Sequence, residues 1–130
     1  MTDRMSITFR APAEWITLNQ RLHWADRARR VKSWRRAAAL FARKTRPGAG
    51  PYALEMLPSF VRVTFGVRDP GRRRDPHNYM PTVKAIIDGL VDAGVWPDDT
   101  AEWVTVHDSQ FERAATRTVT VDIWPREAQP

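Results

Sequence analysis

Stretches of alternating apolar and polar side chains predict four β-strands. Residues 6–10 (SITFR) and 60–67 (FVRVTFGV) follow this pattern, and the second stretch is rich in β-branched residues. Residues 103–107 and 117–124 (RTVTVDIW) predict a closing pair of strands near the end of the chain. We expect the four segments to form one small sheet.

Residues 24–44 predict a long helix, because the segment contains no Gly or Pro and includes three consecutive alanines. Its other faces carry eight basic side chains with few acids between them. Two interpretations stay open for these cations: a face that contacts phosphates, which their density favours, or a solvated face that only confers solubility. The apolar side chains near helical spacing are Val31, Trp34, Ala38 and Phe41.

Residues 81–93 predict a second, amphipathic helix. Pro81 stands where a first helical residue is expected, and Gly94 is a candidate C-cap. Lys84 and Asp88 lie four residues apart on the polar face, a spacing that by itself predicts only a surface ion pair of small energetic value. The apolar stripe consists of Val83, Ile86, Ile87, Leu90 and Val91.

Together these elements predict one α+β (mixed α/β) domain over residues 1–130, with the order β-α-β-α-β-β. We expect a four-stranded mixed sheet with two main helices packed on it. Residues 47–51 (PGAGP) predict a connector too short for a domain boundary, and the tail from residue 125 is expected to fray. The lack of a long apolar run, of an apolar signal core and of cysteine favours a cytoplasmic protein that does not enter a membrane.

Charge is unevenly distributed along the chain, whose formal net charge is +6. Residues 1–46 contain 12 basic and 3 acidic side chains, whereas residues 75–112 contain 1 basic and 8 acidic side chains. A basic half suggests a polyanionic partner, and an acidic segment beside it would repel that partner. A divalent cation bound between the basic half and the acidic segment would remove this repulsion. The alternative is an ordinary basic protein with a solvated acidic helix.

The acidic segment has candidate metal ligands at both ends. Asp75 follows a strand and a turn, and Asp98 and Asp99 lie in a polar turn, residues 96–100 (WPDDT), after the second predicted helix. Cleavage of a phosphodiester by a metal needs several hard oxygen ligands that converge on one point. A helix of about thirteen residues spans roughly 20 Å, so Asp75 and Asp99 meet only if the flanking loops fold together. An acid-rich loop without a ligand is the simpler alternative.

Three ordered motifs resemble the RusA family of Holliday junction resolvases: residues 72–78 (RRRDPHN), 84–90 (KAIIDGL) and 93–99 (AGVWPDD). That family shows an R-x-R-D-x-D-N start, a lysine-bearing helix that ends in A-G-x-W or similar, and a closing D-D. The match is close over about thirty residues, and looser at the N-terminal strand, Asn19 and the basic segment. The ordered combination is specific, although each motif alone is weak.

The resemblance implies a Mg²⁺- or Mn²⁺-dependent endodeoxyribonuclease that resolves four-way (Holliday) DNA junctions by paired symmetric nicks, in DNA recombination and repair. It also implies a homodimer, because two matched cuts need two sites, and a nucleoid-associated protein of phage or prophage origin. Two alternatives stay open. One is a branched-DNA-binding protein that has lost cleavage, and the other is a nuclease for flaps or other branched DNA.

The same resemblance implies a role for each motif residue. Asp75 and Asp99 are expected to be catalytic metal ligands, and Asp98 is an additional candidate ligand. Lys84 is expected to contact the scissile phosphate or to orient the attacking water. This alignment needs a few extra residues after Asn78, compared with the family pattern.

His77 stands where the family commonly has its second Asp. Three roles stay open: a metal ligand through its imidazole, which would soften the site; a general base or phosphate contact; or a change that weakens or removes activity. We favour a ligand or catalytic role because the surrounding motif is retained. A solvated loop histidine is the structural alternative.

Basic and polar side chains around this site predict a DNA-binding surface. Arg21, His23 and Trp24 are expected near the point of strand exchange, where an aromatic ring can stack on an unpaired base. Core packing is the alternative for most of the six tryptophans, and we expect it for Trp34 and Trp124. The predicted DNA contacts are Arg72, Arg73, Arg74, Asn78, Asn19, Arg21, Arg29, Arg30, Lys32, Arg35 and Arg36.

Overall fold

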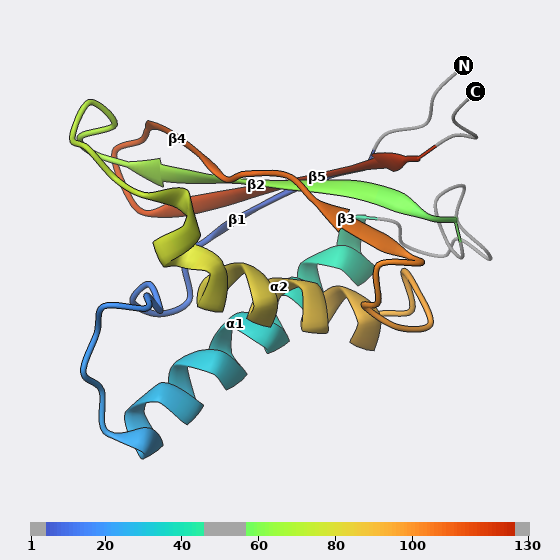
Figure 1. Cartoon of the computed structure of the whole chain (residues 1–130), viewed down its shortest axis with the longest axis horizontal. Helices are drawn as coiled ribbons and strands as arrows, with labels where there is room; N and C mark the ends of the chain where they lie inside the picture. Colours follow the sequence, from blue (N-terminus) through green and yellow to red (C-terminus); the bar gives the residue numbers. More distant parts are fainter. Residues whose placement is uncertain (1–4, 46–56, 127–130) are drawn as a thin grey trace.

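A computed structural model describes residues 5–45 and 57–126 of the 130-residue chain. One sheet forms one layer, and both α-helices lie on the same side of it (Figure 1). The elements in chain order are β1 (Met5–Arg10), α1 (Trp24–Thr45), β2 (Ser59–Val67), the 3₁₀ helix η1 (Pro76–Tyr79), α2 (Met80–Asp92), β3 (Val104–Val106), β4 (Gln110–Arg113) and β5 (Thr118–Pro125).

The sheet is mixed, and β2 pairs with more strands than any other. The strand order is β1-β5-β2-β3, and β4 also pairs with β2. β5 lies antiparallel to both β1 and β2, whereas β3 and β4 lie parallel to β2, beside residues 59–61 and 64–67 respectively. β3 and β4 are therefore two successive parts of one edge, separated at residues 107–109.

The predicted α+β class, with two main helices and a mixed sheet, is confirmed. The predicted number of strands is one too low, because β4 lacks an alternating pattern: only Phe111 packs against the core, and its neighbours in β4 are exposed. The two closing strands are also not paired with each other, since β2 lies between β3 and β5.

The core lies between the sheet and the two helices. Trp34 of α1 has no exposed surface, as predicted. Trp124 differs from the prediction: it is only partly buried, and its ring stacks on that of His107 with centroids 5.6 Å apart. Trp124 alternates with the buried Val121 and Ile123 along β5, so it lies on the sheet face away from the helices.

The two helices pack closely because Gly89 of α2 faces α1. A Cβ atom at Gly89 would lie 2.3 Å from the backbone oxygen of Arg35 and 2.8 Å from Cβ of Ala38. The absence of a side chain at Gly89 therefore sets the distance between the helices. Gly94 follows α2 with a φ of 85°, a conformation that favours glycine, as expected for the end of the helix.

Two predictions concern the ends of the described segments. The predicted connector, residues 47–51, lies outside the described residues, as do residues 127–130 of the tail. Pro125 belongs to β5, and the backbone N of Arg126 donates to the backbone O of Pro58 at 2.8 Å, so these two residues are bound to the sheet. Among residues 5–45 and 57–126, none of the helices has both the length and the hydropathy needed to cross a bilayer.

Candidate functional site

The motif around Asp75 forms a tight loop that leads into η1. The Arg74 guanidinium donates to the backbone oxygens of Asp69 and Arg72, at 2.5 and 3.2 Å, and so closes the turn after β2. Asp75 caps η1, since its carboxylate accepts a hydrogen bond from the backbone N of His77 at 3.0 Å. The side chains of Asp75 and His77 are otherwise exposed, so both are accessible to a ligand.

The segment before α1 is bound to this motif. The backbone N of Asn19 donates to the side-chain oxygen of Asn78 at 3.1 Å, and Leu18 N donates to the backbone O of Asn78 at 2.9 Å. The buried hydroxyl of Thr82 accepts from the backbone N of Ile16 and donates to its backbone O, both at 2.8 Å. These contacts bring Asn19 to the first motif, although the two are far apart in the sequence.

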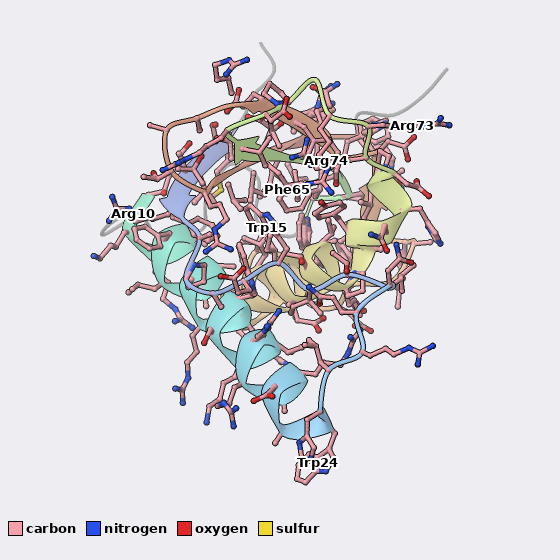
Figure 2. All side chains as sticks on the ribbon, turned by 90° about the vertical axis from the view of Figure 1, so that its left-hand side faces the viewer. Arg10, Trp15, Trp24, Phe65, Arg73 and Arg74 are labelled. Atoms are coloured by element: carbon pink, nitrogen blue, oxygen red, sulfur yellow. The ribbon has the colours of Figure 1, made fainter. Side chains whose placement is uncertain are left out.

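The two segments border a pocket of about 560 Å³. Figure 2 views this end of the molecule, with Trp15 near the centre, Arg74 above it and Arg73 at the upper right. Three arginines against a single aspartate favour an anionic ligand here. Trp15 and Tyr79 add aromatic rings to the lining. The predicted site residues that line the pocket are Asn19, Arg72, Arg73, Arg74, Asp75, His77 and Asn78.

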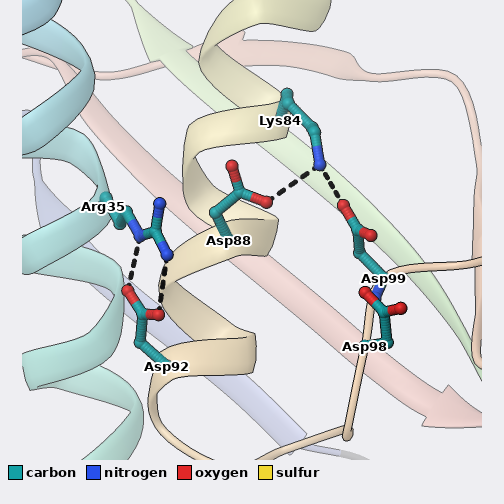
Figure 3. A network of polar contacts seen from close by, with 6 residues as sticks. All are labelled: Arg35, Lys84, Asp88, Asp92, Asp98 and Asp99. Carbon is teal, nitrogen blue, oxygen red and sulfur yellow. Dashed lines mark hydrogen bonds and ion pairs between the residues drawn. The ribbon is translucent and has the colours of Figure 1, made fainter.

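A second group of predicted site residues surrounds Lys84. Its ammonium bonds to the Asp88 carboxylate at 2.9 Å and also contacts the Asp99 carboxylate (Figure 3). The Lys84 side chain is 58% exposed, and those of Asp88 and Asp99 are 26% and 28% exposed. The spacing of Lys84 and Asp88 predicted an isolated pair, and the structure adds Asp99 as a third member.

These contacts determine the protonation of Lys84. Its pKa is raised above the ordinary value, chiefly by the hydrogen bond to Asp99 and then by the one to Asp88. The pKa of Asp99 is lowered, chiefly by the hydrogen bond from Lys84. Lys84 is therefore a cation at neutral pH, which suits it to neutralise a phosphate and not to act as a general base.

Buried side chains in the loop after α2 bring Asp99 back to Lys84. Val95 and Trp96 are 2% and 1% exposed, so the predicted polar turn, residues 96–100, begins with a core residue and follows another. The Trp96 indole donates to the hydroxyl of Ser59 at 3.2 Å and thereby ties the loop to β2. The Asp98 carboxylate then accepts from the backbone N of Asp99 at 2.7 Å, which orients Asp99.

The predicted metal ligands thus lie in two groups: Asp75 and His77 line the pocket, and Asp99 with its neighbour Asp98 lies at Lys84. Across the described ranges, 5–45 and 57–126, no three His, Asp or Glu side chains form a group that could hold a metal ion. Mg²⁺ prefers carboxylate oxygens, which the exposed Asp75 and Asp98 and the partly exposed Asp99 offer, so the donor chemistry of the predicted ligands fits. The meeting of Asp75 with Asp99 stays a prediction.

Several α1 arginines predicted to contact DNA make contacts within the protein. Arg35 binds Asp92 of α2 through two hydrogen bonds, at 2.6 and 2.9 Å, and its pKa is raised chiefly by this contact (Figure 3). Arg29 pairs with Asp26, and Arg30 donates to the backbone O of Trp15 at 3.1 Å. The remaining predicted contacts outside the first motif are exposed: Arg21, Lys32 and Arg36.

A group of arginines that the sequence did not indicate gathers near the end of β2. A shallow depression of about 570 Å³ is lined by Arg10, Arg68 and Arg117. Arg113 lies beside them, since its guanidinium donates to the backbone O of Arg68 at 2.9 Å. These residues come from separate strands and loops, so no local pattern groups them. Only the strand pairing of β1, β2, β4 and β5 does.

Comparison with known proteins adds no relative to these observations. No family model matches the chain, and no curated protein matches it, so an assignment of function depends on the residues and geometry of the site.

Proposed function

We propose that the chain is a metal-dependent endodeoxyribonuclease that cuts branched DNA, with four-way junctions as its substrate and a homodimer as its active form. The observation that carries the proposal is the contact of Lys84 with Asp99, which joins the lysine of α2 to the closing acid of the third motif. The arginine-lined pocket at Asp75 supports it, because a phosphodiester substrate needs cations beside the reacting centre.

Each group has a distinct task in this proposal. Arg72 and Arg73, both exposed, bind phosphates on either side of the cut. Lys84 neutralises charge that develops on the scissile phosphate. Asp75 and Asp99, with Asp98 or His77, would hold the Mg²⁺ or Mn²⁺ ions. When bound, the metal supplies activation of water and further charge neutralisation.

A homodimer follows from the substrate. A four-way junction has near two-fold symmetry, and a C2 dimer presents two equivalent sites to strands on opposite sides of the branch point. Paired symmetric nicks then release two duplexes. A cytoplasmic, nucleoid-associated protein of phage or prophage origin would use this activity in recombination, repair or the removal of branches from DNA.

Incubation of the purified protein with a labelled four-way junction, in Mg²⁺ and separately in Mn²⁺, tests the proposal. We expect symmetric nicks on opposing strands, and much slower cutting of a linear duplex of the same sequence. A flap substrate in parallel distinguishes a junction resolvase from a nuclease for other branched DNA. Tight binding without nicks in either metal would exclude the enzyme.

That last outcome corresponds to the second candidate function, a branched-DNA-binding protein without cleavage. His77 is the observation that favours it, because an imidazole stands where the resembling family commonly has its second carboxylate. The arginine-lined pocket would still bind DNA phosphates in such a protein.

The metal preference of the wild-type protein tests whether His77 is a ligand. We expect cutting to be several-fold faster in Mn²⁺ than in Mg²⁺, because Mg²⁺ strongly prefers oxygen ligands and Mn²⁺ accepts an imidazole more readily. The measurement is the initial rate of junction cutting at matched metal concentrations.

His77→Asp provides the matched variant. A carboxylate at this exposed position is expected to shift the preference towards Mg²⁺. Equal or faster cutting by the wild-type protein in Mg²⁺ would mean that His77 does not ligate the metal.

A further inference from the structure

Trp24 is the most exposed large hydrophobic residue among the described ones, with 76% of its surface accessible. It is the first residue of α1, and its nearest aromatic neighbour is His23, at 5.5 Å between ring centroids. Trp34 and Trp96 are buried, and Trp15, Trp103 and Trp124 are partly buried. An indole in this setting is available to contact another molecule.

The surface beside Trp24 combines an apolar floor with cations. A shallow hollow of about 460 Å³ is lined by Trp24, Ala28 and Val31, and by Arg27, Lys32 and Arg35. Arg35 is paired with Asp92, whereas neither Arg27 nor Lys32 forms an ion pair with any residue of the described segments. A flat ring with unpaired cations on the same helix suits a ligand that has both an aromatic face and negative charge.

The hollow and the arginine-lined pocket share one end of the molecule. In Figure 2, Trp24 lies at the bottom edge, Arg73 at the upper right, and Trp15 near the centre, at a height between the two. The segment from Trp15 to the start of α1 links the two, and it carries Leu18, Asn19 and Arg21. A nucleic-acid strand bound at the pocket can therefore continue towards α1.

We propose that Trp24 stacks on an unpaired base of branched or single-stranded DNA, while Arg27 and Lys32 bind the adjoining phosphates. The charge of α1 favours DNA as the partner, because the helix carries eight basic side chains and one acidic side chain. This net positive charge attracts a polyanion and repels a second copy of the same helix. Stacking on aromatic rings tolerates any base sequence, as a branch point requires. The inference deepens the proposed function, since unpaired bases occur where strands exchange, but it concerns binding alone.

The test uses the full chain with three probes: an oligo-dT strand, a four-way junction with 2-aminopurine at the branch point, and a linear duplex. For the wild-type protein we expect tryptophan fluorescence to be quenched by the first two probes and much less by the duplex. Trp24→Phe should keep the affinity within about threefold but lose most of the quenching, because phenylalanine can still stack but is not excited with tryptophan. Trp24→Ala should bind the strand and the junction about tenfold more weakly, in line with the value of one base–aromatic stack.

Leu40→Ala is the matched control. Leu40 is 47% exposed and lies on the same helix, far from Trp24 in sequence, so its loss should change neither affinity nor quenching. Because Trp24 is exposed, the variants should melt at the temperature of the wild-type protein, and a melting curve verifies that each is folded.

Two results would overturn the inference. One is a Trp24→Ala variant that binds the strand and the junction as tightly as the wild-type protein. The other is a variant that changes from dimer to monomer in sedimentation, which would assign Trp24 to a contact between copies of the chain. If the wild-type protein nicks the junction and Trp24→Ala does not change binding, only this inference is contradicted. If the wild-type protein binds DNA and its fluorescence is quenched but no nicks form, only the proposed nuclease is contradicted.

Discussion

Asp75→Asn is expected to lower the rate of junction cutting about 100- to 1000-fold, because the variant would hold poorly the metal that neutralises charge in the transition state. The neutral amide is a weak ligand for Mg²⁺ compared with a carboxylate. DNA binding should be retained or tightened, because the exposed carboxylate beside three arginines would no longer repel phosphate. Single-turnover cutting of a labelled junction measures the rate, and a gel-shift titration without metal measures the binding.

Asp99→Asn should cause a loss of the same size, since Asp99 is the second expected ligand and the partner of Lys84. Asp108→Asn is the control: Asp108 is an exposed acid of the same acidic segment and has no assigned role. Its cutting rate should stay within about twofold of the wild-type rate, because an exposed charge with no assigned contact contributes little. Normal cutting by Asp75→Asn would disprove the metal-site assignment, and equal losses in all three variants would indicate a general effect of charge.

Gly89→Val is expected to destabilise the protein by roughly 3 kcal/mol, the upper range for overpacking a tight contact. The added Cβ alone would lie 2.3 Å from the backbone oxygen of Arg35, and a backbone atom cannot rotate away as a side chain can. The helices would have to separate, which would also strain the Arg35–Asp92 contact between them. Thermal unfolding followed by circular dichroism should show a midpoint lower by on the order of 10 °C.

Gly71→Ala provides the comparison for this variant. At Gly71 the nearest atom to a new Cβ is the carboxylate of Asp69, at 3.7 Å, which is an ordinary contact. Its melting temperature should therefore match that of the wild-type protein within a few degrees, since an exposed position without a clash rarely shifts stability by more than about 0.5 kcal/mol. If Gly89→Val has the same melting temperature as Gly71→Ala, the two helices can move apart at little cost in free energy.

The regular elements could be predicted from the sequence because each is defined by contacts within a few residues. The predicted helix over residues 24–44 is α1 apart from one residue at its end, and the predicted strand over 60–67 is β2 apart from one at its start. The helical period and the strand alternation are visible without any knowledge of the partner element. β4 was missed because its side chains are mostly exposed and its only signal is its pairing with β2.

The site was only partly predictable, for the same reason. The spacing of Lys84 and Asp88 is local and gave the correct ion pair. The contact of Lys84 with Asp99 depends on the burial of Trp96, whose partner Ser59 lies in another part of the chain. A tryptophan followed by a proline and two aspartates suggests a polar turn, and only the assembled core shows that the indole is inside it.

The pairing of β1 with β5 has a consequence for how the chain folds. Met5 lies opposite Ile123, and β5 is the only strand that pairs with β1 among the described residues, so β1 cannot join the sheet before β5 is present. Contacts of such large sequence separation close late and slow the search for the native state. A nascent chain that still lacks residues 118–125 can form α1 and α2 but not the complete sheet, and it exposes the apolar faces of β1 and β2 until those residues have been made.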